Sequence, residues 1–313
     1  MNPTPPLAPT VFVSMCRSAL GAQHVRFLAH SLRTFGGPLS GAPLWVFLPH
    51  SASAPLDPEI DPGRFSGLDP VHFIPFSLEP DVPDYLFSEK VHACARAEAL
   101  ADAQARTLVW LDPSCLITNP PVLFDLAPDH AAAFRPVHHK NVGLTAQEPL
   151  DAFWQAIYQA VGLRQAPFSL PSFVDRQELR PYFNTHCFAV DPAQGLLRAW
   201  QSHFERLAAD QDFQARACSD TLHQVFLHQA ILSALVASRL ERGQLRILPP
   251  EYSYPLHMHP QVPPLDQPAT LDELVCPVYE DAFVYPDTLN GLAAQQPLRA
   301  WLEQHAPEVQ PGA

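Results

Sequence analysis

The chain has 313 residues, 47% of them hydrophobic, which is enough for a sizeable buried core. Its 19 basic against 32 acidic residues give a formal net charge of −13. This balance argues against a nucleic-acid partner, because neutralising phosphates needs concentrated Lys and Arg.

Short apolar runs alternate along the chain with stretches that carry apolar residues at helical spacing, beginning with a strand at 11–16 and a helix at 19–35. The other predicted strands are 44–48, 71–76, 107–111, 131–134, 183–190 and 245–248. The other predicted helices are 88–105, 150–162, 193–209, 219–240 and 291–305. Apolar strands that alternate with helices predict an α/β fold with a mainly parallel, Rossmann-like central sheet flanked by helices.

The prolines, 36 in all, gather between the periodic stretches and mark connections. Periodicity weakens near residue 250, so we predict an α/β domain over 1–250 and a proline-rich C-terminal extension over 251–313, packed on the same domain. The apolar run at 11–15 is too short for a signal peptide or a membrane span. Six scattered cysteines without a C-x-x-C pair favour free, buried thiols, and the chain is therefore predicted to be cytoplasmic.

Polar residues that follow apolar runs are candidates for a binding site, because ligands of an open parallel sheet bind beyond the carboxyl ends of its strands. This rule selects the segments 14–17, 135–139 and 184–186, together with Asp112. The turn after the first strand lacks the glycines of a G-x-G-x-x-G dinucleotide site, and there is neither a P-loop nor a G-x-S-x-G elbow. Dehydrogenase, P-loop NTPase and covalent hydrolase functions are therefore disfavoured.

Positive charge is scarce in this chain, and at two places it lies where it could meet an anion. Lys90, one of two lysines, lies near the start of a predicted helix, where its ammonium group and the helix dipole could both face a diphosphate. Basic residues and histidines also cluster at 135–140, just beyond a strand. In each case a solvated surface group is the alternative interpretation.

Four segments, in this order, resemble the A-type fold of nucleotide-sugar glycosyltransferases, within the nucleotide-diphospho-sugar transferase superfamily. Residues 11–17 resemble the first strand and its loop, 90–98 with 107–114 the helix and strand that end in a D-x-D motif, 181–190 the "YFNSG"-type strand, and 226–232 the "DQ" helix start. The resemblance implies a hexosyltransferase-like enzyme that transfers a sugar from a nucleotide-diphosphate donor to an unidentified hydroxyl acceptor.

The D-x-D motif is degenerate, since its third position is Ser114 and Asp112 alone remains. In metal-dependent members the two carboxylates hold Mn²⁺ or Mg²⁺ against the donor diphosphate. The family often supplies a histidine from a late loop, so the resemblance implies His257 and His259 as further ligands of a metal at Asp112. Metal dependence stays open at this point, because a single carboxylate holds a divalent ion poorly.

The predicted site combines the sheet-edge rule with this resemblance. His186 replaces the glycine of the "FNSG" pattern, and His228 replaces the aspartate of "DQ". The predicted donor-binding residues are Ser14, Arg17, Lys90, Asp112, Ser114 and Arg135. Asn184, His186 and Gln229 are predicted to contact the sugar or the acceptor. His138, His139 or His228 is predicted to be the general base, because an imidazole with a pKa near neutrality suits deprotonation of a hydroxyl.

Two other functions remain open. The chain could be a non-catalytic nucleotide-sugar-binding protein that has lost its metal site. It could also be a metal-dependent nucleotidyltransferase or phosphodiesterase, which needs at least two clustered carboxylates. The expected partners are a small-molecule nucleotide sugar and an unknown acceptor, with no nucleic acid and no membrane span.

Overall fold

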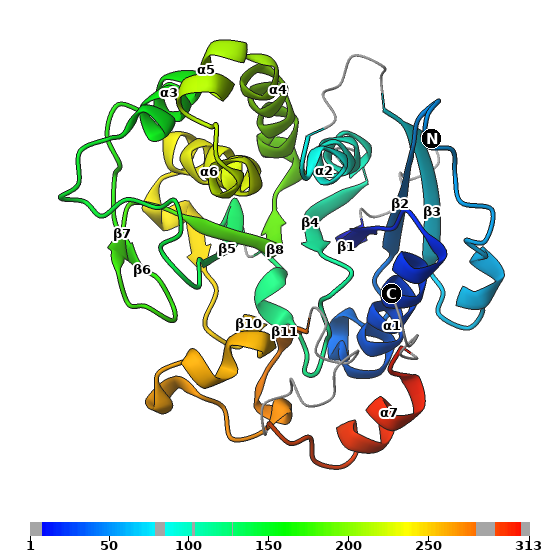
Figure 1. Cartoon of the computed structure of the whole chain (residues 1–313). Coiled ribbons are helices and arrows are strands. Elements are labelled where there is room, and N and C mark those ends of the chain that lie inside the picture. The colour runs from blue at the N-terminus through cyan, green and yellow to red at the C-terminus, as the bar shows by residue number, and fades with distance from the viewer. Residues whose placement is uncertain (1–7, 79–84, 102–103, 127, 280–291, 308–313) are drawn as a thin grey trace.

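A seven-stranded sheet forms the centre of the computed structural model, which describes residues 8–78, 85–101, 104–126, 128–279 and 292–307 (Figure 1). In spatial order the strands are β3 (Val71–Ser77), β2 (Leu44–His50), β1 (Ala8–Met15), β4 (Ala105–Leu111), β8 (Phe183–Val190), β5 (Ala132–Pro136) and β9 (Leu245–Ile247). Neighbouring strands are parallel except that β8 runs antiparallel to both β4 and β5. The predicted α/β fold with a mainly parallel sheet is confirmed.

The helices lie close to their predicted positions. They are α1 (Ala19–Phe35), α2 (Ser88–Ala101), α3 (Ala152–Val161), α4 (Leu196–Ala209), α5 (Gln211–Arg216), α6 (Thr221–Arg239) and α7 (Leu298–His305). Side-chain oxygens of Ser18, Asp151 and Asp220 accept backbone N–H groups at the starts of α1, α3 and α6. Polar caps that the sequence places before apolar periodic stretches therefore fix where these helices begin.

Two helices begin three or more residues later than predicted. Helix α4 begins at Leu196 rather than at 193, because Gly195, with φ +64°, separates it from a preceding 3-10 turn. Helix α7 begins at Leu298 rather than at 291, since Pro297 disfavours a helical conformation in the residue before it. Residue 291 lies outside the described residues. The short helix α5 was not predicted.

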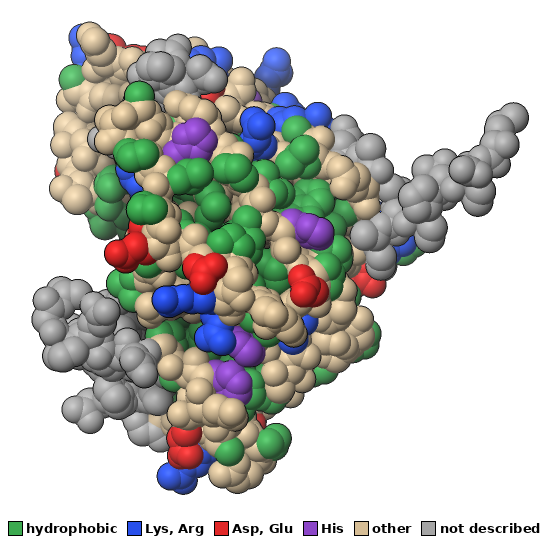
Figure 2. All heavy atoms as spheres, turned by 90° about the vertical axis from the view of Figure 1, so that its right-hand side faces the viewer, with side chains coloured by type: hydrophobic (Ala, Val, Ile, Leu, Met, Phe, Trp, Pro, Cys, Tyr) green, Lys and Arg blue, Asp and Glu red, His purple; other side chains and the backbone are tan. Residues whose placement is uncertain are grey.

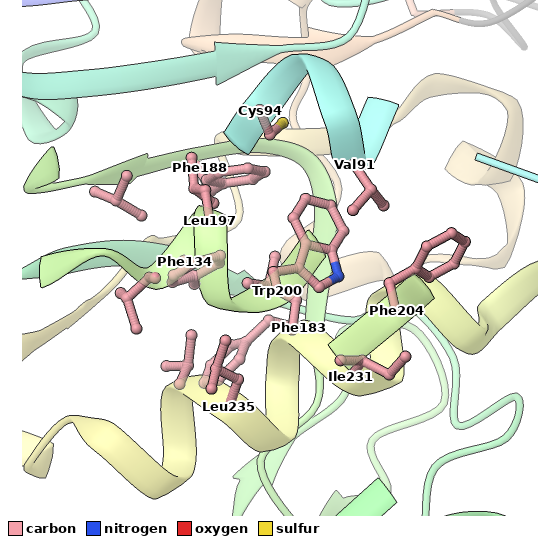
Figure 3. Packing of buried hydrophobic residues seen from close by; sticks show 14 of the residues in the cluster. Val91, Cys94, Phe134, Phe183, Phe188, Leu197, Trp200, Phe204, Ile231 and Leu235 are labelled. Atoms are coloured by element: carbon pink, nitrogen blue, oxygen red, sulfur yellow. The ribbon is translucent and has the colours of Figure 1, made fainter. Parts of the chain in front are cut away.

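Apolar side chains from both faces of the sheet are buried against helices. One face packs against α2, α3, α4 and α6, and Figure 3 shows Trp200 of this layer among Val91, Phe204 and Ile231. The other face packs against α1, through residues such as Val25. The sheet is thus the middle layer of three, and the edge where β1, β4 and β5 end remains for polar residues.

Residues beyond 250 build a small layer under α1. Strands β10 (Tyr252–Pro255) and β11 (Cys276–Val278) form a parallel pair, and α7 follows them (Figure 1). The apolar residues of this segment share a buried cluster with Phe27 of α1 and Leu116. These strands, and the short hairpin of β6 (Leu170–Pro171) and β7 (Glu178–Leu179), were not predicted. The division of the chain at residue 250 stays a prediction.

The six cysteines are free and buried, as predicted. Among the helices that the structure describes, none is long and apolar enough to cross a membrane. On the face shown in Figure 2, acidic and basic side chains are interspersed and do not gather into one basic patch. The cytoplasmic location stays a prediction.

Candidate functional site

The ends of four strands meet at one edge of the sheet. The carboxyl ends of β1, β4 and β5 lie there because these strands run in the same direction. Strand β8 is antiparallel, and Leu111 at the end of β4 pairs with Cys187 near the start of β8. The first residues of β8 therefore reach the edge where ligands of such sheets bind.

Strand β8 bulges at this edge. Phe134 of β5 pairs with Phe188, but Pro136 pairs with Phe183, where a regular register would place His186. The extra residues leave the ladder between these pairs, and bulges of this kind turn side chains and carbonyl groups toward sites. Asn184, Thr185 and His186 consequently supply polar groups to both neighbouring strands.

A buried ion pair lies where β4 meets this bulge. Lys90 Nζ on α2 is 2.8 Å from Asp112 Oδ1 and 2.9 Å from Oδ2, and it donates to the Thr185 carbonyl at 2.8 Å. Trp110 Nε1 donates to Asp112 Oδ1 at 2.7 Å. The side chains of Lys90 and Asp112 are 7% and 17% exposed, so the charges compensate each other largely out of water.

His228 supports the bulge from the side of α6. Its Nδ1 donates to the Val225 carbonyl at 3.0 Å, which leaves Nε2 to accept from the Thr185 hydroxyl at 3.1 Å. Phe87, just before α2, stacks on the His228 ring with a centroid separation of 4.2 Å. Phe87 is 43% exposed and has φ +64°, a conformation that L residues adopt at a cost. An exposed aromatic ring, on a residue with a strained backbone, thus covers the His228 ring.

The strain at Phe87 predicts an unusual order of stabilities. Phe87→Gly should be more stable than Phe87→Ala by about 1 kcal/mol, because glycine has no Cβ to oppose the positive φ. Urea unfolding of the two variants measures the difference. Arg96, which is exposed in the middle of α2, is the control. Arg96→Ala should be more stable than Arg96→Gly, since glycine weakens a helix interior. Equal stability of the two Phe87 variants would contradict the strain.

A second polar group lies on the β5 side of the bulge. Asn184 Oδ1 accepts from the His186 backbone N–H at 2.7 Å and from Ser253 Oγ at 3.3 Å. This orients the amide so that Nδ2 donates to His138 Nε2 at 3.1 Å. Arg135 is buried nearby, with its guanidinium 4.7 Å from the Phe173 ring centroid. The polar residues therefore form two neighbouring groups, one on each side of the bulge.

Burial lowers the pKa of both His138 and His228 well below the usual value for histidine. The charges of His186 and Arg135 add to this effect on the pKa of His138, and Lys90 adds to it on the pKa of His228. Both rings are neutral near pH 7, and the Nε2 lone pair of each already accepts a hydrogen bond. His139 differs, because its ring is partly exposed and Nδ1 lies 3.7 Å from Asp175 Oδ2.

The other predicted donor-binding residues are distributed around the edge. Arg17 is half exposed and pairs with Glu89 at 2.7 Å, next to Lys90. Ser14 is buried, and its hydroxyl has no hydrogen-bond partner among the residues that the structure describes. The backbone carbonyl of Ser114 accepts from Tyr279 N at 2.9 Å and so ties the loop after β4 to the segment after β11.

The predicted late-loop histidines lie on a 3-10 helix, Leu256–Gln261, and Gln229 lies on α6. His257 is near enough to His138 to lower its pKa. His259 is buried, and its Nδ1 is 2.7 Å from the Tyr254 hydroxyl. Gln229 is buried beside His228, and its backbone carbonyl accepts from Ser233 Oγ. The roles assigned to these residues stay predictions.

A family model described as the Rhodobacterales glycosyltransferase domain matches residues 14–238, which include both polar groups of the edge except Ser253. The chain belongs to this family. None of the curated proteins matches it. Among solved structures, this glycosyltransferase domain is similar to the apo structure of the WbbM bifunctional glycosyltransferase, with a TM-score of 0.51 and 13% identity. The likeness covers 97% of this chain and 53% of that one, so the chain spans about half its length. The predicted glycosyltransferase family and fold are confirmed.

The described residues of the glycosyltransferase domain do not fit a divalent metal at Asp112. Both carboxylate oxygens already contact Lys90, and His259 bonds to Tyr254. Within the described ranges no group of three or more His, Cys, Asp or Glu side chains could hold a metal ion, so Asp112, His257 and His259 do not assemble as implied. The Lys90 ammonium already compensates the charge of the Asp112 carboxylate, and metal dependence stays a prediction.

Three residues of the glycosyltransferase edge were not predicted. Trp110 lies two residues before Asp112 on the same strand, so alternation along a strand could have paired their side chains. Thr185 stood inside the selected segment 184–186 but was given no role. Phe87 left no sequence signal, because a positive φ at a phenylalanine cannot be read from residue type.

Proposed function

We propose that this glycosyltransferase domain transfers a sugar from a nucleotide-diphosphate donor to a hydroxyl-bearing acceptor, at the edge where β4 meets the β8 bulge. The observation that carries the proposal is the buried Lys90–Asp112 pair, placed after a central strand and held by Trp110 and Thr185. A charged pair with this many fixed partners is a costly element in a core, and such groups cluster at functional sites.

Positive charge at this edge would stabilise the leaving diphosphate, which gains negative charge as the glycosidic bond breaks. Arg17 is suited to contact it, because its pair with Glu89 is at the surface and exchanges for a phosphate at little cost. Lys90 would hold Asp112 in place and add its field. No step in this scheme needs a divalent metal at Asp112.

Deprotonation of the acceptor hydroxyl would fall to His139. Of the three predicted bases, its ring is the one that is partly exposed, and the Asp175 carboxylate is placed to stabilise its protonated form. His138 and His228 would instead orient Asn184 and Thr185.

The proposal predicts nucleotide binding that does not depend on a metal. Calorimetric titration with UDP and GDP should show binding of at least one, with a Kd that changes by less than about threefold between Mn²⁺ and EDTA. Arg17→Gln should weaken binding, because it removes the charge placed to contact the diphosphate, whereas Arg216→Gln, an exposed arginine on α5, should leave it unchanged. No binding of either nucleotide would overturn the proposal.

Turnover separates an enzyme from a binding protein. Slow hydrolysis of the nucleotide sugar that matches the bound nucleotide is expected for the transferase, and its complete absence would favour a non-catalytic binding protein. A nucleotidyltransferase or phosphodiesterase gains no support from Asp112, whose carboxylate is paired with Lys90 instead of with a second carboxylate.

A further inference from the structure

Arg135 carries unused hydrogen-bonding capacity in a buried place. Its side chain follows Phe134 on β5, whose ring packs in the layer of α2, α4 and α6, so Arg135 points to the other face of the sheet. The residue is 5% exposed, and neither Nε nor Nη2 has a hydrogen-bond partner among the described residues. These two N–H groups lie along one edge of the guanidinium and form the fork that binds a carboxylate or phosphate in two parallel hydrogen bonds.

His138 adds a third unused donor. Because its Nε2 accepts from Asn184 and the ring is neutral, the proton is on Nδ1. Nδ1 is buried and, in the part of the chain that the structure describes, has no partner. Both groups lie against Phe173. The centroid of the His138 ring is 6.4 Å from the centroid of the Phe173 ring, and the guanidinium carbon of Arg135 is 4.7 Å from it. Three donors without acceptors thus border one aromatic ring.

The charges around Arg135 are mixed. Burial lowers the pKa of Arg135 to about 10, so the group stays charged at neutral pH. Arg176 lies over the same Phe173 ring but is paired with Asp266. The field of Glu251 reaches Arg135, yet no ion pair joins the two within the described residues, and Glu251 Oε2 is buried without a partner.

Among the described residues, Arg135 Nε and Nη2 and His138 Nδ1 therefore have no bonded acceptor, and the nearby Glu251 carboxylate acts on Arg135 only through its field. Unsatisfied buried donors of this kind are costly and rare in native proteins. An oxyanion is the class of ligand that accepts hydrogen bonds from donors of this kind.

We propose that Arg135, His138 and Phe173 form a subsite for an oxyanion, a carboxylate or a phosphate, that the acceptor sugar carries. This inference rests on the proposed sugar transfer and names the class of its acceptor. The subsite is distinct from the Lys90–Asp112 pair, because the β8 bulge lies between them. The His186 ring stacks at 6.3 Å from His138, and its backbone carbonyl accepts from Asp112 N, so one residue links the two groups.

Ligand-observed NMR titration of the full chain with three sugars tests the subsite. Glucuronate or glucose 6-phosphate should bind at least about tenfold more tightly than glucose, since a charged bidentate contact is gained. The better of the two charged sugars identifies the oxyanion. Equal binding of all three sugars, or binding of none, would overturn the proposal.

Arg135→Lys keeps the charge and removes the fork, so it should lower the affinity for the charged sugar by about tenfold or more while glucose is unaffected. Arg216→Gln is the matched surface control.

If Glu251 is instead the real partner of Arg135, Arg135→Lys and Glu251→Gln would both lower the free energy of unfolding and neither would change sugar binding. That result would overturn the proposed subsite. UDP and GDP binding by Arg135→Lys should persist. If the unmodified chain binds the charged sugar but neither UDP nor GDP, the proposed donor is wrong and the proposed oxyanion subsite is still supported.

Discussion

Lys90→Met is expected to lower the free energy of unfolding by about 3–5 kcal/mol, because it leaves the Asp112 carboxylate without its compensating charge in a largely buried place. The Thr185 carbonyl loses its donor as well, which frees the β8 bulge on one side. Urea unfolding followed by fluorescence measures the loss.

The other lysine of the chain is a matched control. Lys140 pairs with Glu148 near the surface, so Lys140→Met should cost less than about 1 kcal/mol. Adding Asp112→Asn to Lys90→Met removes the stranded charge and should recover about 2 kcal/mol or more of the loss. Similar costs for the two lysine variants, or no recovery in the double variant, would contradict a coupled buried pair.

Nucleotide binding should depend on the same Lys90–Asp112 pair. If the carboxylate is held for the donor, Lys90→Met should also weaken nucleotide binding, and the double variant should not restore it although it regains stability. This dissociation of binding from stability distinguishes a positioned carboxylate from a merely structural ion pair.

Much of the fold could be predicted, because apolar runs and helical spacing carry the information that fixes each strand and helix. The position of Asp112 was predictable for the same reason, since it directly follows an apolar strand. Strand direction was not. Residues 184–186 were selected at the mouth of a strand in a sheet expected to be mainly parallel, and they reach the edge because β8 is antiparallel and begins there.

The partners of the site residues could not be predicted, because they depend on long-range packing. Lys90 was expected to face a diphosphate with the help of the dipole of α2, but its ammonium bonds to Asp112 and Thr185. Arg135 was expected beside the donor phosphates, and the structure places it with His138 on the far side of the bulge. Residue type showed which groups carry charge, and only the register of β8 shows which of them meet.

Trp200→Ala is expected to destabilise the chain by about 3–5 kcal/mol, the usual cost of truncating a buried aromatic side chain. Trp200 is completely buried between the sheet and α6, as Figure 3 shows. Its Nε1 donates to the His228 carbonyl at 2.8 Å, and the two rings lie 6.2 Å apart. Trp200→Phe keeps most of the apolar volume and should cost about 1–2 kcal/mol, mainly through the lost hydrogen bond.

A second large-to-small variant, on the other face of the sheet, separates an effect on nucleotide binding from an effect on stability. Phe124 is equally buried but packs on the α1 face against Tyr252, so Phe124→Ala should destabilise the chain to a similar extent. Because Trp200 supports His228, and His228 supports both Thr185 and Phe87, Trp200→Ala should weaken nucleotide binding, whereas Phe124→Ala should leave it within about twofold. Calorimetric titration at 15 °C, where both variants remain folded, makes the comparison. Equal nucleotide affinities of the two variants would show that the α6 layer supports the fold without shaping the site.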